Sequence, residues 1–393
     1  MAKPLKLGLI SFFRGDLTEN MSQLRVNNRL EKDLIGRIEG MLEGDQVEQG
    51  ELRSPRTEEV FRRVGYIGPE EVDVSNYVRS RPVAAFNPGA WMNEKRGELQ
   101  VFPRLVFDYY NYSSSVGLFR LDPEDVLRGD LPEKVSTELV LWPDREWEFQ
   151  LGCEDPRIGY REEEDELLML YTASQRYYDM SGELIQKPAQ GLAFFTEEME
   201  LKSKDRLAIV DDRGSYVPPC KDSAFLDIEG DRAEMLLRPN VAGKEFCWRG
   251  TARLDEGEVS LESLRPVLAP AGWEAKIGWS TNGLRLGPDA YLVGWHGVQQ
   301  EDLAYKEGLA LVSGEGDLLA ISDYVLEPEG VRENYGDRPF VIFGDGLVRI
   351  EDKLLWVGGV SDYCIGFFLA ELKDVLEVLH WKERPEQIEL TDF

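Results

Sequence analysis

Residues 152–158 read Gly-Cys-Glu-Asp-Pro-Arg-Ile and open an extended, aromatic-rich stretch of the chain. Proline fixes its own φ and moves the preceding Asp155 out of the helical region, which aims this short carboxylate in one direction. Arg157 is close enough to orient a carboxylate or to hold an anion. The same residues also suit a turn with an ion pair, because turns favour Asp and Pro. The heptapeptide therefore predicts either a catalytic carboxylate or a structural turn.

Short apolar or alternating runs, separated by turn signals, make up most of the chain from about residue 80 onward. Residues 99–107, 166–173, 287–295 and 353–360 are examples. Many short strands at fairly even spacing are typical of a sandwich, a barrel or a propeller. Because no strict repeat is visible, the spacing by itself does not decide among these all-β architectures.

The sequence pattern is different near the two ends of the chain. Residues 5–13 predict a short buried strand, and residues 57–64 a helical turn or two. Residues 371–381 predict a closing helix. Residues 18–44 predict a long amphipathic helix, because apolar positions recur near every 3.6 residues between many charges. The apolar stripe of this helix consists of Met21, Leu24, Leu30, Leu34, Ile38 and Leu42.

The charge of the chain limits its partners. Its 393 residues include 45 basic and 74 acidic side chains, which gives a formal net charge of -29. Such a surface repels nucleic acid and anionic membranes, so we expect neither as a partner. It favours a neutral substrate, and a phosphate ion needs a local cluster of cations to bind.

Cysteine usage indicates the compartment. Cys153, Cys220, Cys247 and Cys364 are widely spaced, form no Cys-x-x-Cys pair and are accompanied by only two histidines. A zinc site is therefore not expected, and free thiols in a reducing compartment are the simplest interpretation. The apolar run at residues 7–13 is too short for a membrane span and lacks a small-residue cleavage site. We expect a cytoplasmic protein.

The heptapeptide at residues 152–158 resembles the Gly-x-Glu-Asp-Pro-Arg-Ile segment of glycoside hydrolase family 130, which comprises mannoside phosphorylases and β-mannosidases. Further segments resemble the family's motifs and follow in the family's order over roughly residues 80–380. They are Asn87-Pro88-Gly89-Ala90, Lys221-Asp222-Ser223-Ala224-Phe225, Arg238-Pro239, Lys276-Ile277-Gly278, Trp295-His296-Gly297-Val298 followed by Tyr305, and Gly359-Val360-Ser361-Asp362.

The resemblance implies an all-β chain folded as a five-bladed β-propeller, with an N-terminal helical or α/β appendage that the family does not explain. The predicted division is an appendage at residues 1–78, a catalytic propeller at residues 79–382 and an acidic tail at residues 383–393. Terminal helices can serve subunit contacts in relatives, and the apolar stripe at residues 21–42 must bury against something. We therefore expect a homo-oligomer.

The resemblance also implies an enzyme that cleaves β-mannosides with inversion. Asp155 is expected to be the general acid, passing its proton through a hydroxyl of the bound mannose, while inorganic phosphate attacks from the other side and yields mannose 1-phosphate. No metal or organic cofactor is required. Glu154 is expected to point away from Asp155 and to orient an arginine. The implied phosphate-binding residues are Lys221, Arg238, Lys276, His296 and Tyr305, and the sugar-binding residues are Asn87, Arg104, Arg157 and Asp362.

Departures from the family pattern keep other interpretations open. Leu237 stands where the family usually has histidine, and residues 109–115 replace its Ser-x-Asp-Gly region. One alternative is an inverting β-mannosidase in which a carboxylate activates water. Another is a catalytically silent propeller that binds glycans or protein partners. Taken singly, His296 also suits a core position, Asp362 a turn cap, and each lysine or arginine a solvated surface charge.

Overall fold

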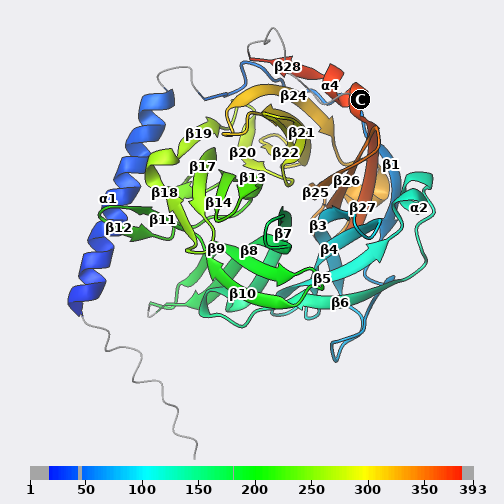
Figure 1. Ribbon diagram of the computed structural model, residues 1–393, viewed down its shortest axis with the longest axis horizontal. Coiled ribbons are helices and arrows are strands. Elements are labelled where there is room, and N and C mark those ends of the chain that lie inside the picture. Colours follow the sequence, from blue (N-terminus) through cyan, green and yellow to red (C-terminus); the bar gives the residue numbers. More distant parts are fainter. Residues whose placement is uncertain (1–16, 43–46, 180, 383–393) are drawn as a thin grey trace, which may run out of the picture.

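The computed structural model describes residues 17–42, 47–179 and 181–382. Strands dominate the regular structure, and the sheets are arranged around a common centre (Figure 1). The prediction of an all-β fold is therefore confirmed. The strand predicted at residues 5–13 and the tail predicted at residues 383–393 lie outside the described residues.

The nine-stranded sheet consists of two groups of strands, antiparallel within each group except that β2 pairs in parallel with β6. The groups meet only where Ser114 and Gly152 form a single parallel pair. Gly152 has a φ of +87°, and a Cβ there would lie 2.2 Å from the backbone oxygen of Ser114, so this junction requires glycine. The first group contains β2 (Val72–Val74), β3 (Ala84–Asn93), β4 (Glu98–Val106), β5 (Ser114–Leu121) and β6 (Val135–Leu141), and the second β7 (Gln150–Arg161), β8 (Glu166–Tyr178), β9 (Leu184–Thr196) and β10 (Leu201–Arg206).

The remaining strands form three larger sheets and one short pair. The seven-stranded sheet contains β11 (Ala208–Asp211), β12 (Gly214–Tyr216), β13 (Ala224–Glu229), β14 (Arg232–Leu237), β17 (Cys247–Arg253), β18 (Glu258–Ser260) and β19 (Arg265–Leu268). The six-stranded sheet contains β20 (Glu274–Trp279), β21 (Leu284–Gly287), β22 (Ala290–Gln299), β23 (Tyr305–Val312), β24 (Leu318–Leu326) and β28 (Leu379–Trp381). The four-stranded sheet has the order β1 (Arg62–Ile67), β27 (Cys364–Glu371), β26 (Lys353–Val360) and β25 (Ile342–Ile350), and the short pair is β15 (Asn240–Val241) with β16 (Lys244–Glu245).

Helices are few and lie at the edges of these sheets. Besides the long N-terminal helix, they are short connections of one or two turns. All four cysteines are buried free thiols, as predicted. Within the described part of the chain no helix has both the length and the apolar composition needed to cross a membrane. The helices are α1 (Leu17–Leu42), α2 (Pro123–Arg128), α3 (Gly330–Asn334) and α4 (Leu372–Glu377), with single 3₁₀ turns at Glu146–Glu148 and Leu261–Ser263.

Two predictions near the chain ends are wrong in part. Residues 57–64 contain no helix, because β1 begins at Arg62 and pairs antiparallel with β27. Phe61 is buried, and its ring centroid lies 5.3 Å from that of Trp356, so long-range packing prevails over the local pattern. The helix predicted at residues 371–381 covers only α4, since β28 pairs with β24. The division at residue 78 stays a prediction, although it does not coincide with a sheet boundary.

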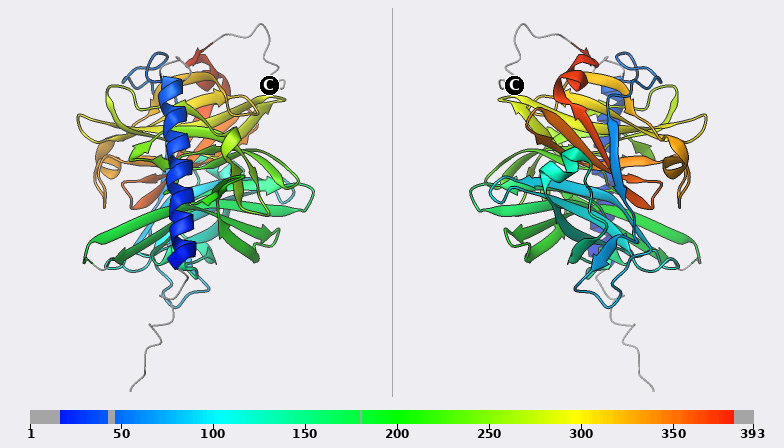
Figure 2. Two further views of the ribbon diagram at one scale, coloured as in Figure 1. Left: turned by 90° about the vertical axis from the view of Figure 1, so that its left-hand side faces the viewer. Right: turned by 90° about the vertical axis from the view of Figure 1, so that its right-hand side faces the viewer.

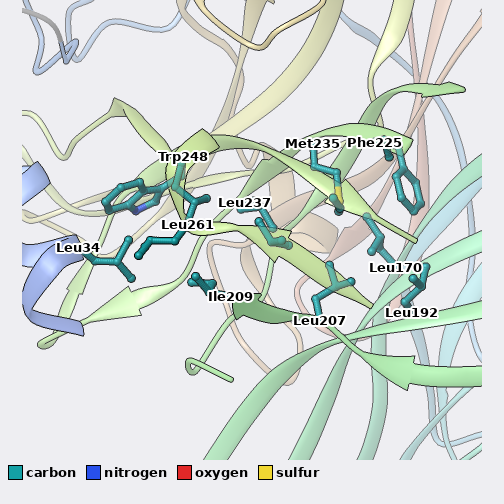
Figure 3. Close-up of a cluster of buried hydrophobic side chains, with 14 of the residues drawn as sticks. Leu34, Leu170, Leu192, Leu207, Ile209, Phe225, Met235, Leu237, Trp248 and Leu261 are labelled. Atoms are coloured by element: carbon teal, nitrogen blue, oxygen red, sulfur yellow. The ribbon is translucent and has the colours of Figure 1, made fainter. Parts of the chain in front are cut away.

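The long N-terminal helix is confirmed as α1 and runs along the outside of the molecule (Figure 2). Its residues Leu30, Leu34 and Ile38 are buried in a core cluster of the same chain, where Leu34 lies near Trp248 and Leu261 (Figure 3). Arg37 also donates to the carbonyl oxygen of Leu264 at 2.9 Å. These three apolar residues therefore need no partner subunit, and the homo-oligomer stays a prediction.

Candidate functional site

Asp155 lies at a bulge in the middle of β7. The pairing of β7 with β8 shifts register between Glu154 and Arg157, and Asp155 has a left-handed φ of +51°. Pro156 cannot donate to the ladder, so it is tolerated at such a bulge. Asn87 occupies a similar place in β3, with a φ of +43° beside a register shift. Two inner strands, which lie next to each other, thus break their ladders at polar residues.

Asn87 and Arg104 hold the carboxylate of Asp155. The Asn87 amide donates to Oδ1 of Asp155 at 2.9 Å, and Nη1 of Arg104 donates to the same oxygen at 3.1 Å. Nη2 of Arg104 reaches Oε1 of Glu154 at 3.0 Å, and its Nε donates to Oγ of Ser114 at 2.8 Å. Because of the bulge, both neighbouring carboxylates meet one arginine. The expectation that Glu154 points away is therefore wrong.

Two acidic groups of this site have raised pKa values. Burial raises the pKa of Glu154 to about 7, although Arg104 opposes this shift. Burial likewise raises the pKa of Asp362 to about 6, against the effect of Arg338. Both carboxyl groups therefore titrate close to neutral pH, and the negative charge of the site varies there.

Cations gather around the same carboxyl groups. Burial and the nearby Lys221 lower the pKa of Lys276, and Lys221 also acts electrostatically on Glu154. Neither lysine forms an ion pair with a carboxylate among the residues that the structure describes. Arg338, which is mostly exposed, lies 3.7 Å from Asp362. The two lysines therefore carry positive charge that the protein itself does not neutralise.

Two arginines that are predicted to bind ligands are buried and form hydrogen bonds with protein oxygens. Arg238 donates to Oδ2 of Asp222 at 2.5 Å and to Oε2 of Glu245 at 2.6 Å. Burial acts to raise the pKa of Asp222, but Arg238 and Lys221 outweigh it and hold that pKa below its usual range. Arg157 donates to the backbone oxygens of Ser280 at 2.7 Å and Asp155 at 2.9 Å. Both guanidinium groups therefore orient the site from within the protein.

His296 and Tyr305 lie together, as the sequence predicts. Their ring centroids are 5.9 Å apart at an interplanar angle of 21°. Nδ1 of His296 lies 3.0 Å from Oγ of Ser280, and burial lowers its pKa well below the usual range, so the ring is neutral at pH 7. A Cβ at Gly278 would lie 2.4 Å from Cε1 of His296, so the glycine makes room for the ring. His296 is thus a buried side chain, while Tyr305 is half-buried.

Sequence reasoning missed a bridge between two loops. Hydroxyl groups of Tyr109 and Tyr112 donate to the two carboxylate oxygens of Asp337 at 3.0 and 2.8 Å. The ring of Tyr112 lies 5.9 Å from the guanidinium carbon of Arg104, and Arg338 follows Asp337 directly. The bridge therefore connects the neighbourhood of Arg104 with that of Arg338. Only the run of tyrosines at residues 109–112 signals it, because the partners are more than 200 residues apart in sequence.

A cavity of about 760 Å³ lies at the far ends of the inner strands rather than at Asp155. Its lining includes Trp91 of β3, Tyr160 of β7 and Val348 of β25, which come after the site residues along these strands. None of the predicted site residues lines this cavity. No cluster of three or more His, Cys, Asp or Glu side chains within the described ranges has the arrangement of a metal site.

Comparisons with known proteins show the family of the chain. The model of glycoside hydrolase family 130, described as beta-1,4-mannooligosaccharide phosphorylase, matches residues 51–381. No curated protein matches the chain. Among solved structures, the beta-1,2-mannobiose phosphorylase from Listeria innocua in complex with beta-1,2-mannobiose is similar, with a TM-score of 0.60 and 16% identity over 79% of this chain and 96% of that one.

Two further solved structures share the fold. A glycosyl hydrolase from Bacteroides ovatus has a TM-score of 0.60 and 17% identity over 84% of this chain and 96% of its own. A mannose phosphorylase from Leishmania mexicana in complex with phosphate ion has a TM-score of 0.52 and 14% identity over 79% of this chain and 89% of its own. The family match confirms the prediction of a glycoside phosphorylase or glycoside hydrolase: the chain belongs to glycoside hydrolase family 130.

Proposed function

We propose that this protein cleaves β-mannosides by inverting phosphorolysis, with inorganic phosphate as co-substrate and mannose 1-phosphate as product. One observation carries the proposal: Lys221 and Lys276 have no carboxylate partner among the described residues, yet lie in a chain of net charge -29. A phosphate dianion needs such convergent cations, whereas attack by water does not. A β-mannoside or manno-oligosaccharide is the second substrate, and neither a metal nor an organic cofactor takes part.

Asp155 is the proposed general acid, and its two carboxyl oxygens have different surroundings. Both described donors, from Asn87 and Arg104, bind Oδ1. Oδ2 receives no hydrogen bond from a described residue, so this oxygen faces the substrate and delivers the proton. Arg104 keeps the carboxyl group in place while the proton passes through a mannose hydroxyl to the leaving oxygen. Phosphate then attacks the anomeric carbon from the opposite face.

The other site residues divide between sugar and phosphate. Oδ1 of Asn87 is buried without a hydrogen-bond partner among the described residues, so it is an acceptor that a mannose hydroxyl can satisfy. Asp362 has its pKa raised to about 6 and is the second proposed sugar contact. Tyr305 offers phosphate a neutral donor beside His296. Arg157 and Arg238 act as positioning residues, because protein oxygens already engage them.

We also propose that the sheets form five propeller blades. The single-pair junction between β5 and β7 divides the nine-stranded sheet into two blades, β3–β6 and β7–β10. The seven-, six- and four-stranded sheets then supply one blade each. A cytoplasmic location and a homo-oligomer remain further proposals; the four buried thiols suit a reducing compartment.

An inverting β-mannosidase is the alternative within the same family, and a neutral buffer with or without phosphate separates the two reactions. We expect turnover of β-mannobiose only with phosphate present, and mannose 1-phosphate as the product by ³¹P NMR. Release of free mannose at an equal rate without phosphate would establish the hydrolase. A complete lack of turnover on mannosides of every linkage would favour a silent binding protein.

Replacement of Asp155 by asparagine should abolish catalysis but preserve binding. The amide keeps an Oδ1 for Asn87 and Arg104 but has no proton of suitable acidity, so kcat should fall by roughly 10²–10⁴. Steady-state phosphorolysis gives kcat, and calorimetric titration with mannobiose gives the affinity. Glu162→Gln, at an exposed glutamate outside the site, is the control. A near-normal kcat in Asp155→Asn would remove Asp155 from the mechanism.

Lys221→Ala and Lys276→Ala should each raise the KM for phosphate far more than the KM for the sugar. A charge-assisted contact of roughly 1.5–3 kcal/mol corresponds to about 10- to 150-fold in phosphate affinity. Kinetics with phosphate and sugar varied independently measure both constants. Lys373→Ala, at an exposed lysine of α4, should change neither. Equal losses for both substrates would mean that the lysines support the general shape of the site instead.

The raised pKa of Glu154 predicts how stability depends on pH. Between its ordinary value of 4.5 and about 7, the folded protein retains a proton that the unfolded chain loses. The free energy of unfolding of the wild type minus that of Glu154→Gln should therefore fall as the pH rises from about 4.5 to 7. Above pH 7 this difference should stay constant. Urea denaturation at a series of pH values measures this difference. A difference that rises over this range would show that Arg104 dominates over burial.

A further inference from the structure

A second concave surface lies directly beside the site. Its volume is about 690 Å³, within the range of ordinary ligand pockets. Three segments line it: residues 76–79 before β3, residues 107–115 between β4 and the start of β5, and residues 139–143 at the end of β6. We call this surface the Trp142 groove, after the tryptophan that lines it.

One short strand segment separates the groove from the site. Ser113 and Ser115 line the groove, whereas Ser114 between them accepts the hydrogen bond from Arg104. Such alternation is typical of extended backbone, in which successive side chains point to opposite sides; β5 itself begins at Ser114. Neither Ser113 nor Ser115 has a hydrogen-bond partner for its hydroxyl group among the described residues. Both hydroxyl groups are therefore available to a ligand.

Hydrogen bonds fix the walls of the groove before any ligand binds. Asn76 donates to and accepts from the backbone of Leu139, at 3.0 and 2.8 Å. Lys204 donates to the carbonyl oxygen of Trp142 at 2.7 Å. Asp108 accepts from the backbone N–H of Tyr110 at 2.9 Å and thus shapes the loop behind it. Such preorganisation lowers the entropy that binding costs.

The exposed chemistry of the groove suits a neutral, hydroxylated ligand. Trp142 is 47% exposed and Tyr77 is 44% exposed, so each presents a flat ring to solvent. Rings of this kind combine an apolar face with a polar edge, as the faces and hydroxyl groups of a sugar require. Charge is balanced, because the lining contains one cation, Arg79, and one carboxylate, Asp108. A protein of net charge -29 thus has a local surface without excess charge.

We propose that the Trp142 groove is a carbohydrate-binding site separate from the catalytic centre, with a neutral oligosaccharide as its ligand. Trp142 and Tyr77 stack on sugar rings, while Ser113 and Ser115 bind hydroxyl groups. A mannose-containing ligand is the specific choice, and this choice rests on the proposed function. Because the groove and the site share the segment Ser113–Ser115, a long manno-oligosaccharide held in the groove is retained close to Asp155.

Calorimetric titration of the Asp155→Asn protein tests the proposal without turnover. The probes are β-1,4-mannohexaose and β-1,2-mannohexaose, the two linkages that occur in the relatives. Adding Trp142→Ala should weaken binding of one probe by about tenfold or more, as loss of an anchoring aromatic side chain does. Trp142→Phe should recover most of the affinity. Tyr178→Ala removes an exposed aromatic residue outside the groove and is the matched control.

Activity gives the second measurement. Trp142→Ala in the wild-type background should cleave mannobiose with unchanged kcat and KM, because a disaccharide fills only the catalytic site, but its KM for a hexaose should rise. Identical titrations of the Trp142→Ala and parent proteins with both hexaoses would overturn the proposal, as would equal effects of Trp142→Ala and Tyr178→Ala. Failure of the proposed function can be distinguished from failure of the groove proposal. In the first case the wild-type protein does not turn over mannobiose at all.

Discussion

The buried guanidinium of Arg157 is the interaction on which the rest of the structure depends. It donates to the carbonyl oxygens of Ser280 and Asp155, and its Nη2 lies 2.7 Å from Asp345 and 3.4 Å from Asp222. These partners belong to β7, to β25 and to the segments beside β13 and β20. One cation thus joins four parts of the centre. Removing it would take a cation from beside the buried Asp222 and Asp345 and would leave the two carbonyl oxygens without their donor, which is costly.

Burial, opposed by this central charge, makes the carboxyl groups around Arg157 unusual in protonation. Burial raises the pKa values of Glu307 and Asp345 well above their usual range, against the opposing effect of Arg157. Asp222 instead stays ionised, because Arg238 and Lys221 add to its stabilisation. Carboxyl groups in one neighbourhood therefore differ in charge according to how many cations each one meets. Among the described residues of the site, Lys221 and Lys276 have no carboxylate partner.

The heptapeptide predicted the family of the chain better than its own geometry. Pro156 fixed the break in β7, and the resemblance of residues 152–158 led to the family that residues 51–381 match. The same local reasoning failed for Glu154, because alternation of side chains assumes an unbroken strand. It failed again for residues 57–64, where pairing with β27 outweighs a local helical pattern. Local patterns report local preferences, and these are weaker than the burial of a side chain such as Phe61.

By itself, the sequence determined the all-β class, the long N-terminal helix and the free thiols. These follow from periodicity, composition and short motifs, which depend on neighbours along the chain. Only the tertiary structure decided that Arg157 and Arg238 are buried while Lys221 and Lys276 keep their charge available. It also decided that Tyr112 meets Asp337, and that Ser114 faces the site while Ser113 and Ser115 face a groove. The reason is physical: burial and ion pairing depend on which distant segments pack together, and no local pattern contains that information.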